Sequence, residues 1–209
     1  ARILDAEIIS LDSMAIYRGM DIGTGKDYGD YLVNGSQVPF HLIDILDAGE
    51  EYNVYEFQSD FLKVYETLKS NNVVPILCGG SGMYIEAVLK GYKLINVPVN
   101  EDLRTSLQEH SLEELSSILS KFKTLHNQSD VDTKKRAIRA IEIASYYQDN
   151  GDIDFTYPKI SSVIFGINLE RQLVKDRITA RLKQRLREGM IDEVETLINS
   201  GVPKETLIY

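Results

Sequence analysis

The stretch that decides the fold is Glu7-Ile8-Ile9-Ser10-Leu11, which runs directly into Asp12-Ser13-Met14-Ala15. The apolar run from Ile8 to Leu11 is short, as expected of a buried strand. It ends at a polar pair, and the segment beyond reaches the turn residues Gly19 and Gly23. In an open parallel sheet, ligands bind beyond the carboxyl ends of the strands. We therefore expect Asp12 and Ser13 at a binding edge, although either residue could instead cap a following helix.

A second buried strand is predicted from Val73 to Cys78, an apolar run that ends in Gly79-Gly80-Ser81-Gly82. Apolar residues at helical spacing follow from Met83 to Leu89 and also precede the strand, between Tyr52 and Lys69. A strand, a glycine turn and a helix in succession are typical of α/β proteins. The glycines allow the backbone to approach an anionic ligand at the helix N-terminus, or they simply form the turn.

The remaining pattern divides the chain. Short apolar runs predict further strands at 41–45 and 162–167, and helical spacing predicts helices at 169–188 and 191–199. From Val97 onward the strand pattern stops, and leucines recur at helical spacing. We therefore predict an α/β core, a parallel sheet flanked by helices, formed by residues 1–96 and 158–209. A small all-helical domain, residues 97–157, is inserted into it.

The composition of the 209 residues is that of a globular protein, with 43% hydrophobic and 26% charged residues. A net charge of −9 argues against indiscriminate coating of nucleic acid, so a nucleic-acid partner requires a local basic surface. The single cysteine excludes an internal disulfide and fits the cytoplasm. No apolar run reaches the length of about 18 residues needed to span a membrane. We expect a monomer, because no long exposed apolar stripe is left over.

Two basic groups stand out against this acidic background. Lys134, Lys135, Arg136 and Arg139 fall within one short segment, while Arg177, Arg181 and Arg185 recur every four residues and share one helix face. Either group could be an ordinary solvated face. Arginine also suits phosphate oxygens, because its planar fork donates two hydrogen bonds to them.

Longer phrases give the chain a family resemblance. Asp12-Ser13-Met14-Ala15-Ile16-Tyr17-Arg18-Gly19-Met20-Asp21-Ile22-Gly23-Thr24 and Val38-Pro39-Phe40-His41-Leu42-Ile43-Asp44 closely resemble signatures of the tRNA dimethylallyltransferases (tRNA isopentenyl transferases). Arg136–Arg139 with Ala140-Ile141-Glu142, and Arg177-Ile178-Thr179-Ala180-Arg181, match further family patterns. The family's Gly-Gly-Thr reads Gly79-Gly80-Ser81 here, which keeps the hydroxyl. The resemblance covers nearly the whole chain.

The resemblance implies a P-loop NTPase-like core and an inserted helical domain that grips the tRNA anticodon arm. It also implies a reaction: transfer of a dimethylallyl group from dimethylallyl diphosphate to N6 of the adenosine on the 3′ side of the anticodon, with Mg²⁺. By position in the family patterns, the catalytic residues are Asp12 as general base, Ser81, and Arg181. The residues implied to contact tRNA are Asp12, Ser13, Met14, Ala15, Ser81, Arg104, Lys135, Arg136, Ala137, Ile138 and Arg139. Those implied near the diphosphate are Thr24, Arg177 and Arg181, and no metal ligand is assignable.

One family motif does not occur in the sequence. Members carry a phosphate loop, Gly-x-x-x-x-Gly-Lys-Ser/Thr, upstream of the Asp12 phrase, and Gly23-Thr24-Gly25-Lys26 lacks that spacing. We therefore expect these residues to be part of a longer polypeptide. Three alternatives stay open: an isopentenyltransferase acting on free AMP, ATP or ADP; a P-loop small-molecule kinase; and an RNA-binding module that has lost its phosphate loop.

Overall fold

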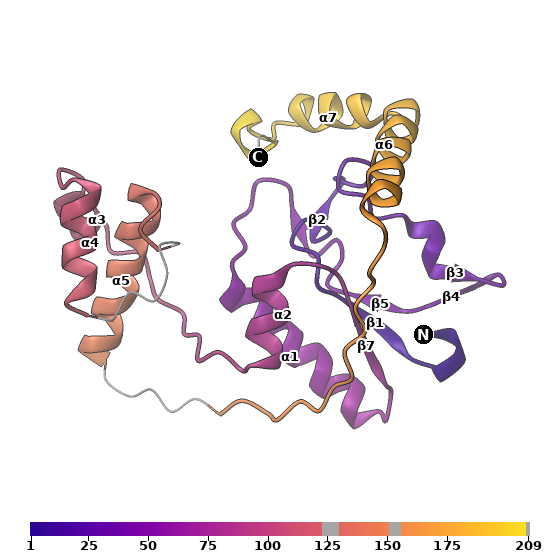
Figure 1. Ribbon diagram of the computed structural model, residues 1–209, viewed down its shortest axis with the longest axis horizontal. Coiled ribbons are helices and arrows are strands. Elements are labelled where there is room, and N and C mark those ends of the chain that lie inside the picture. Colours follow the sequence, from indigo (N-terminus) through magenta and orange to yellow (C-terminus); the bar gives the residue numbers. More distant parts are fainter. Residues whose placement is uncertain (123–129, 151–155, 208–209) are drawn as a thin grey trace. The chain divides into compact units, whose positions relative to one another are not determined.

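The computed structural model describes residues 1–122, 130–150 and 156–207. The chain separates into two compact units, one formed by residues 1–92 together with 158–209, and the other by residues 93–157 (Figure 1). The second unit begins at Lys93, compared with Val97 in the prediction.

The first unit is built on a parallel sheet. Strand β1 (Glu7–Ser10) lies at its centre, between β5 (Phe40–His41) and β7 (Pro75–Cys78), and both pairings are parallel. In this register Ile8 lies opposite Phe40 on one side and Ile76 on the other. The predicted α/β fold with a parallel sheet is confirmed, and the carboxyl ends of β1 and β7 come to one edge because Ser10 pairs with Cys78.

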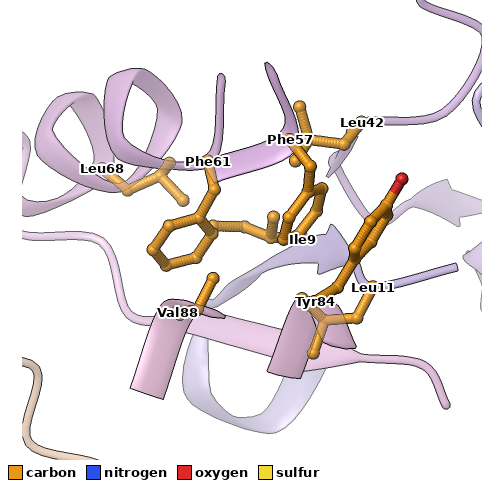
Figure 2. Close-up of a cluster of buried hydrophobic side chains, with 8 residues drawn as sticks. All are labelled: Ile9, Leu11, Leu42, Phe57, Phe61, Leu68, Tyr84 and Val88. Atoms are coloured by element: carbon orange, nitrogen blue, oxygen red, sulfur yellow. The ribbon is translucent and has the colours of Figure 1, made fainter. Parts of the chain in front are cut away.

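Helices α1 (Val54–Ser70) and α2 (Gly82–Leu89) pack against this sheet through one hydrophobic cluster (Figure 2). Ile9 of β1 is fully buried there, among Phe57 and Phe61 of α1 and Val88 of α2. The ring of Phe57 stacks on that of Tyr84 at a centroid distance of 3.8 Å. Burying these side chains supplies the main driving force for folding, at roughly 1.5–3 kcal/mol each, and it fixes the carboxyl end of β1.

Two predicted strands differ from the structure. The strand expected at 41–45 is shorter, because Leu42 and Asp44 adopt φ values of 60° and 55°, which are incompatible with an extended strand. The strand expected at 162–167 is absent, and its large apolar side chains are 73–90% exposed. An apolar run becomes a strand only where it finds a partner, and in the described part of the chain the sheet ends at β7.

The rest of the first unit is made of short elements and two helices. Strand β2 (Tyr17–Arg18) pairs in parallel with β6 (Leu46–Asp47), and β3 (Leu32–Val33) forms a hairpin with β4 (Ser36–Gln37). Helices α6 (Arg171–Arg187) and α7 (Met190–Asn199) are joined by Glu188 and Gly189. Short 3-10 turns lie at Arg2–Leu4, Tyr28–Tyr31 and Lys204–Leu207.

The second unit is helical, with α3 (Glu101–Leu107), α4 (Leu112–Ser120) and α5 (Lys134–Asn150). It has its own core, made of Leu107, Leu115, Leu119, Ala137, Ile138 and Ile141. Among the described residues of the whole chain, none of the helices combines the length and the apolar character that crossing a membrane requires.

Candidate active site

The predicted site residues Asp12, Ser13 and Ser81 meet at the carboxyl edge of the sheet. The Ser13 N–H donates to Ser81 Oγ over 3.1 Å, and the two hydroxyl oxygens lie 3.3 Å apart. Ser81 occupies the N-cap of α2, yet its hydroxyl makes no capping hydrogen bond there. The hydroxyl is used instead to join the end of β1 to the turn after β7.

A close backbone approach makes this junction possible. The Leu11 N–H donates to the Cys78 carbonyl over 2.8 Å, and the Ser81 N–H donates to the Leu11 carbonyl over 3.3 Å. Between these bonds Gly79 has a φ of 154°, and a Cβ atom there would lie 2.6 Å from the Leu11 carbonyl carbon. Only glycine fits, so the glycine turn is required by packing as well as by chain direction.

Asp12 is exposed at this edge. Its N–H donates to Ser10 Oγ over 3.2 Å, and its Oδ1 accepts from the Met14 N–H over 2.8 Å. The carboxylate therefore closes a local turn, but no helix follows it, since residues 13–26 form turns and the short strand β2. The helix-cap interpretation is wrong. Ser13 and Met14 are half-buried and Ala15 is buried, so Asp12 is the most accessible of these four residues.

A second polar cluster, which the sequence did not predict, surrounds Lys26. Its side chain is fully buried, and its ammonium donates to the Tyr17 carbonyl over 2.5 Å, to Asp21 Oδ1 over 2.7 Å and to Asp44. Burial raises the pKa of the Tyr28 phenol, and the hydrogen bond that Tyr28 donates to Asp44 raises it further. The phenol therefore stays protonated. Lysine is seldom buried without such partners. These contacts hold the segment between Tyr17 and Lys26 in place.

We call residues 21–27 the Gly25 loop. Arg181 of α6 donates to Asp27 and, over 3.3 Å, to the Gly25 carbonyl, while Arg185 lies 3.8 Å from the same Asp27 carboxylate. A Cβ at Gly25, whose φ is 75°, would overlap the Arg185 guanidinium. Thr24 donates its hydroxyl to the Met20 carbonyl.

The structure therefore places two of the three predicted diphosphate residues, Thr24 and Arg181, around the Gly25 loop. It adds Arg185, which the four-residue spacing had placed on the same helix face as Arg181 but which the family patterns did not assign to the diphosphate. Arg177 lies exposed one turn earlier on α6.

The predicted tRNA contacts of the helical unit are less uniform. Glu142 has a side chain only 2% exposed, and it accepts hydrogen bonds from Arg104 Nε and Nη2, each at 3.0 Å, and from Arg139. It also accepts from the Asn100 N–H over 2.7 Å. Burial alone would raise the pKa of Glu142, but the hydrogen bonds from Arg104, Asn100 and Arg139 outweigh it and hold the pKa below its ordinary value. Arg104 and Arg139 thus serve the internal structure of this unit.

The remaining members of the basic segment differ in exposure. Arg136 pairs with Asp132 over 2.5 Å, and Lys135 is exposed. Ala137 and Ile138 are buried in the helical core, so their side chains do not reach the surface. The expectation that these two side chains contact tRNA is therefore corrected. The exposed positive charge of this segment resides on Lys134, Lys135 and Arg136, and Lys134 donates to the Gln108 carbonyl.

The described residues do not form a site for Mg²⁺ by themselves. Among the described residues no three His, Cys, Asp or Glu side chains converge on one point, and Lys26 binds both Asp21 and Asp44. Mg²⁺ is commonly held by one or two carboxylates together with substrate phosphates. Mg²⁺ therefore stays a prediction, and no step of the reaction is derived through it.

The polar groups at the carboxyl edge of the sheet indicate a general class of protein. A parallel sheet with a carboxylate and two hydroxyls at the carboxyl ends of its strands is typical of α/β proteins that bind ligands at that edge. The chain belongs to the IPP transferase family, because the model of that family, described as IPP transferase, matches residues 15–208.

Curated relatives support the same assignment. The chain is 56% identical to "tRNA dimethylallyltransferase 2" of Bacteroides fragilis and 58% identical to "tRNA dimethylallyltransferase 1" of Parabacteroides distasonis. Each alignment covers 99% of this chain and 67% of the relative. The resemblance seen in the sequence phrases is thereby confirmed, and the chain belongs to a family of prenyltransferases.

Solved structures agree with the fold. The full-length tRNA isopentenylpyrophosphate transferase of Bacillus halodurans is 33% identical with a TM-score of 0.63, covering 97% of this chain and 64% of that one. A eukaryotic dimethylallyltransferase acting on tRNA has a TM-score of 0.74 at 18% identity, over 96% of this chain and 51% of that one, and this likeness shows the fold alone. The chain thus spans about two thirds of the length of its bacterial relatives.

Proposed function

We propose that the protein transfers a dimethylallyl group from dimethylallyl diphosphate to N6 of the adenosine on the 3′ side of the anticodon in tRNA. The bond that forms joins N6 to the allylic C1 of the donor. The bond that breaks joins C1 to the diphosphate oxygen, which keeps the electron pair. The proton lost by N6 passes to the Asp12 carboxylate.

The observation that carries this proposal is the position of Asp12. Its carboxylate is exposed at the sheet edge, beside the Ser13–Ser81 hydrogen bond, in a chain of the IPP transferase family. A base must lie within hydrogen-bond reach of the amine it deprotonates. An adenosine turned out of the anticodon loop can reach an open edge of this kind, and proteins that modify a base commonly turn it out in this way.

Arginines of α6 suit the leaving group. Arg181 and Arg185 flank the Gly25 loop, and the two guanidinium groups share one carboxylate, Asp27. Guanidinium groups stabilise the negative charge that develops on a departing diphosphate. In the helical unit, Lys135 and Arg136 are the accessible cations that we propose for the anticodon arm. Cytoplasmic location and a monomeric state stay predictions.

The test uses the full-length protein and dimethylallyl diphosphate with a tRNA anticodon stem-loop, or with AMP, ADP or ATP, as acceptor. We expect transfer to the stem-loop alone. Transfer to a free nucleotide would favour the adenylate isopentenyltransferase, and ATP turnover without prenyl transfer would favour a kinase. Binding of tRNA with neither reaction would favour the RNA-binding module.

Asp12→Ala tests the proposed base. We expect single-turnover transfer to fall by about two to four orders of magnitude, the usual contribution of acid–base catalysis, with tRNA affinity unchanged. Asp12→Asn should behave in the same way, since it keeps the shape of the side chain but cannot accept the proton. Asp5→Asn, at an exposed carboxylate ahead of the same strand, is the matched control. Unchanged single-turnover kinetics in Asp12→Ala would remove this residue from the mechanism.

A further inference from the structure

Glu193 of α7 makes an unusual set of contacts with the Gly25 loop. Its Oε2 accepts from the Asp21 N–H over 2.8 Å and from the Ile22 N–H over 2.7 Å, and its Oε1 accepts from the Gly23 N–H over 2.9 Å. Three consecutive backbone N–H groups therefore converge on one carboxylate. The residues joined in this way lie about 170 positions apart in the sequence.

The ordinary explanation for this glutamate is its place in the first turn of α7, where acidic residues favour the helix dipole. That explanation applies equally to Asp192, which is exposed. It does not account for a carboxylate turned toward another segment of the chain. Successive N–H groups that point to one centre form an anion-binding nest, and here Glu193 occupies it.

The same loop is held from a second helix. Arg181 of α6 contacts the Gly25 carbonyl and Asp27, while the Arg185 guanidinium lies against the Cα of Gly25. Thr24 lies between the part of the loop that Glu193 holds and the part that the arginines hold. Thr24 and the backbone that Arg181 contacts thus follow directly in the chain on the three residues that Glu193 holds.

We propose that Glu193 is a positioning residue for the diphosphate site, acting through residues 21–23 on Thr24 and Arg181. The inference rests on the function proposed above. Without the carboxylate, the three N–H groups lose their acceptor, and the loop no longer holds a single geometry for the diphosphate. The adenosine edge at Asp12 has its own hydrogen bonds and does not depend on Glu193.

Glu193→Gln is the most informative variant, because it keeps the size of the side chain. Its single oxygen can accept from two of the N–H groups, but its NH₂ then faces the third donor. Glu195→Gln is the matched control, since Glu195 lies on the same helix, is exposed and makes the same change of charge. Glu193→Asp keeps the charge but withdraws it by one methylene. Its KM for dimethylallyl diphosphate, its Kd for diphosphate and its amide exchange rates should therefore lie between those of the wild type and of Glu193→Gln.

The experiment measures three quantities in the full-length protein: KM for dimethylallyl diphosphate, the Kd of inorganic diphosphate by calorimetry, and hydrogen exchange of the amides of residues 21–23. In Glu193→Gln we expect KM and Kd to rise about tenfold, the scale of one lost hydrogen bond to a charged group, and amide exchange to accelerate. The affinity for tRNA should stay within about twofold, a change too small to reflect a lost contact. Glu195→Gln should match the wild type in every measurement.

Two outcomes would overturn the inference. Faster amide exchange with unchanged KM and Kd would reduce Glu193 to a structural contact, and unchanged exchange would mean that the carboxylate does not hold the loop. The failure of the proposed function looks different. In that case the wild-type protein itself transfers no prenyl group, while the exchange of residues 21–23 still reports whether Glu193 holds them.

Discussion

Two arginine pairs in this molecule each surround one carboxylate, and they differ in burial. In the helical unit, Arg104 and Arg139 bind Glu142, whose side chain is 2% exposed. In the α/β unit, Arg181 and Arg185 face Asp27, whose side chain is 49% exposed. The sequence alone gives no hint of the difference, because both pairs are arginines on helices that also carry acidic residues.

The difference teaches which arginines are available to a ligand. A buried carboxylate with three sources of hydrogen bonds commits its arginines to the fold, since removing any partner leaves a desolvated charge. An exposed carboxylate shared by two arginines contributes little to stability and leaves charge for an anion. The Glu142 cluster is thus structural, and the Asp27 cluster is the one we assign to the diphosphate.

The largest expected effect on stability follows from removing Glu142. Glu142→Ala leaves Arg104, Arg139 and the Asn100 N–H without their shared acceptor. We expect a loss of about 3 kcal/mol in the free energy of unfolding, the lower end for a broken buried pair, because both guanidiniums are partly exposed. Urea unfolding followed by circular dichroism measures it. A loss below about 1 kcal/mol, the value for a surface pair, would contradict the assignment.

Lowering the pH should produce a related but smaller loss in the free energy of unfolding. The pKa of Glu142 lies below its ordinary value of 4.5, so the folded state binds its proton less readily than the unfolded state. The stabilisation by Glu142 is therefore complete above pH 4.5, and it is lost as the pH falls through the depressed folded pKa. Unfolding midpoints measured from pH 6 downward should show this loss in the wild type and a weaker one in Glu142→Gln. Identical pH profiles would contradict it.

Sequence patterns predicted those parts of the molecule that depend on local information. The apolar runs at Ile8 and Val73 and the helical spacing around Phe57 indicated the sheet and its helices, because burial repeats with the period of each element. The position of Asp12 and Ser13 at the carboxyl edge of the sheet followed from strand direction, whereas the role of Ser81 at that edge was implied by the family resemblance.

Contacts between segments that are distant in the sequence could not be predicted from the sequence. Nothing near Glu193 indicates that its carboxylate binds residues 21–23, and nothing near Lys26 indicates that it is buried against Asp44. The run at 162–167 failed for the opposite reason: its composition favours a strand, but a strand also requires a neighbour. Glu142 closely follows the basic segment in the sequence, but its burial is a property of the folded helices.

Lys135 offers a test of the exposed charge in the helical unit. Unlike Arg104 and Arg139, it is exposed, so Lys135→Ala should leave stability unchanged and weaken tRNA binding. Removing one phosphate contact should lower the slope of log affinity against log salt by about one. Filter binding from 50 to 200 mM salt, roughly the range over which such contacts weaken, measures this slope. Lys121→Ala, at an exposed lysine of the same unit, is the control, and an equal change in both variants would contradict a role for the basic segment.

The smallest effect is expected at Asp27. Asp27→Asn keeps the shape of the side chain but removes the carboxylate that Arg181 and Arg185 share. Because Asp27 and Arg181 are about half exposed and Arg185 lies 3.8 Å from the carboxylate, the free energy of unfolding should change by less than about 1 kcal/mol. The freed arginines should bind diphosphate more tightly, and KM for dimethylallyl diphosphate should fall by at most about fivefold, the same energy expressed as affinity.

Asp47→Asn is the matched control for this variant, because Asp47 forms a similarly exposed pair with Arg18 at 2.8 Å outside the Gly25 loop. It should cost the same small amount of stability and leave KM unchanged. A rise in KM for Asp27→Asn would mean that Asp27 holds Arg181 in place for the diphosphate rather than competing with it. The Asp27 cluster would then resemble the Glu142 cluster, and the distinction between committed and available arginines would rest on geometry rather than on burial.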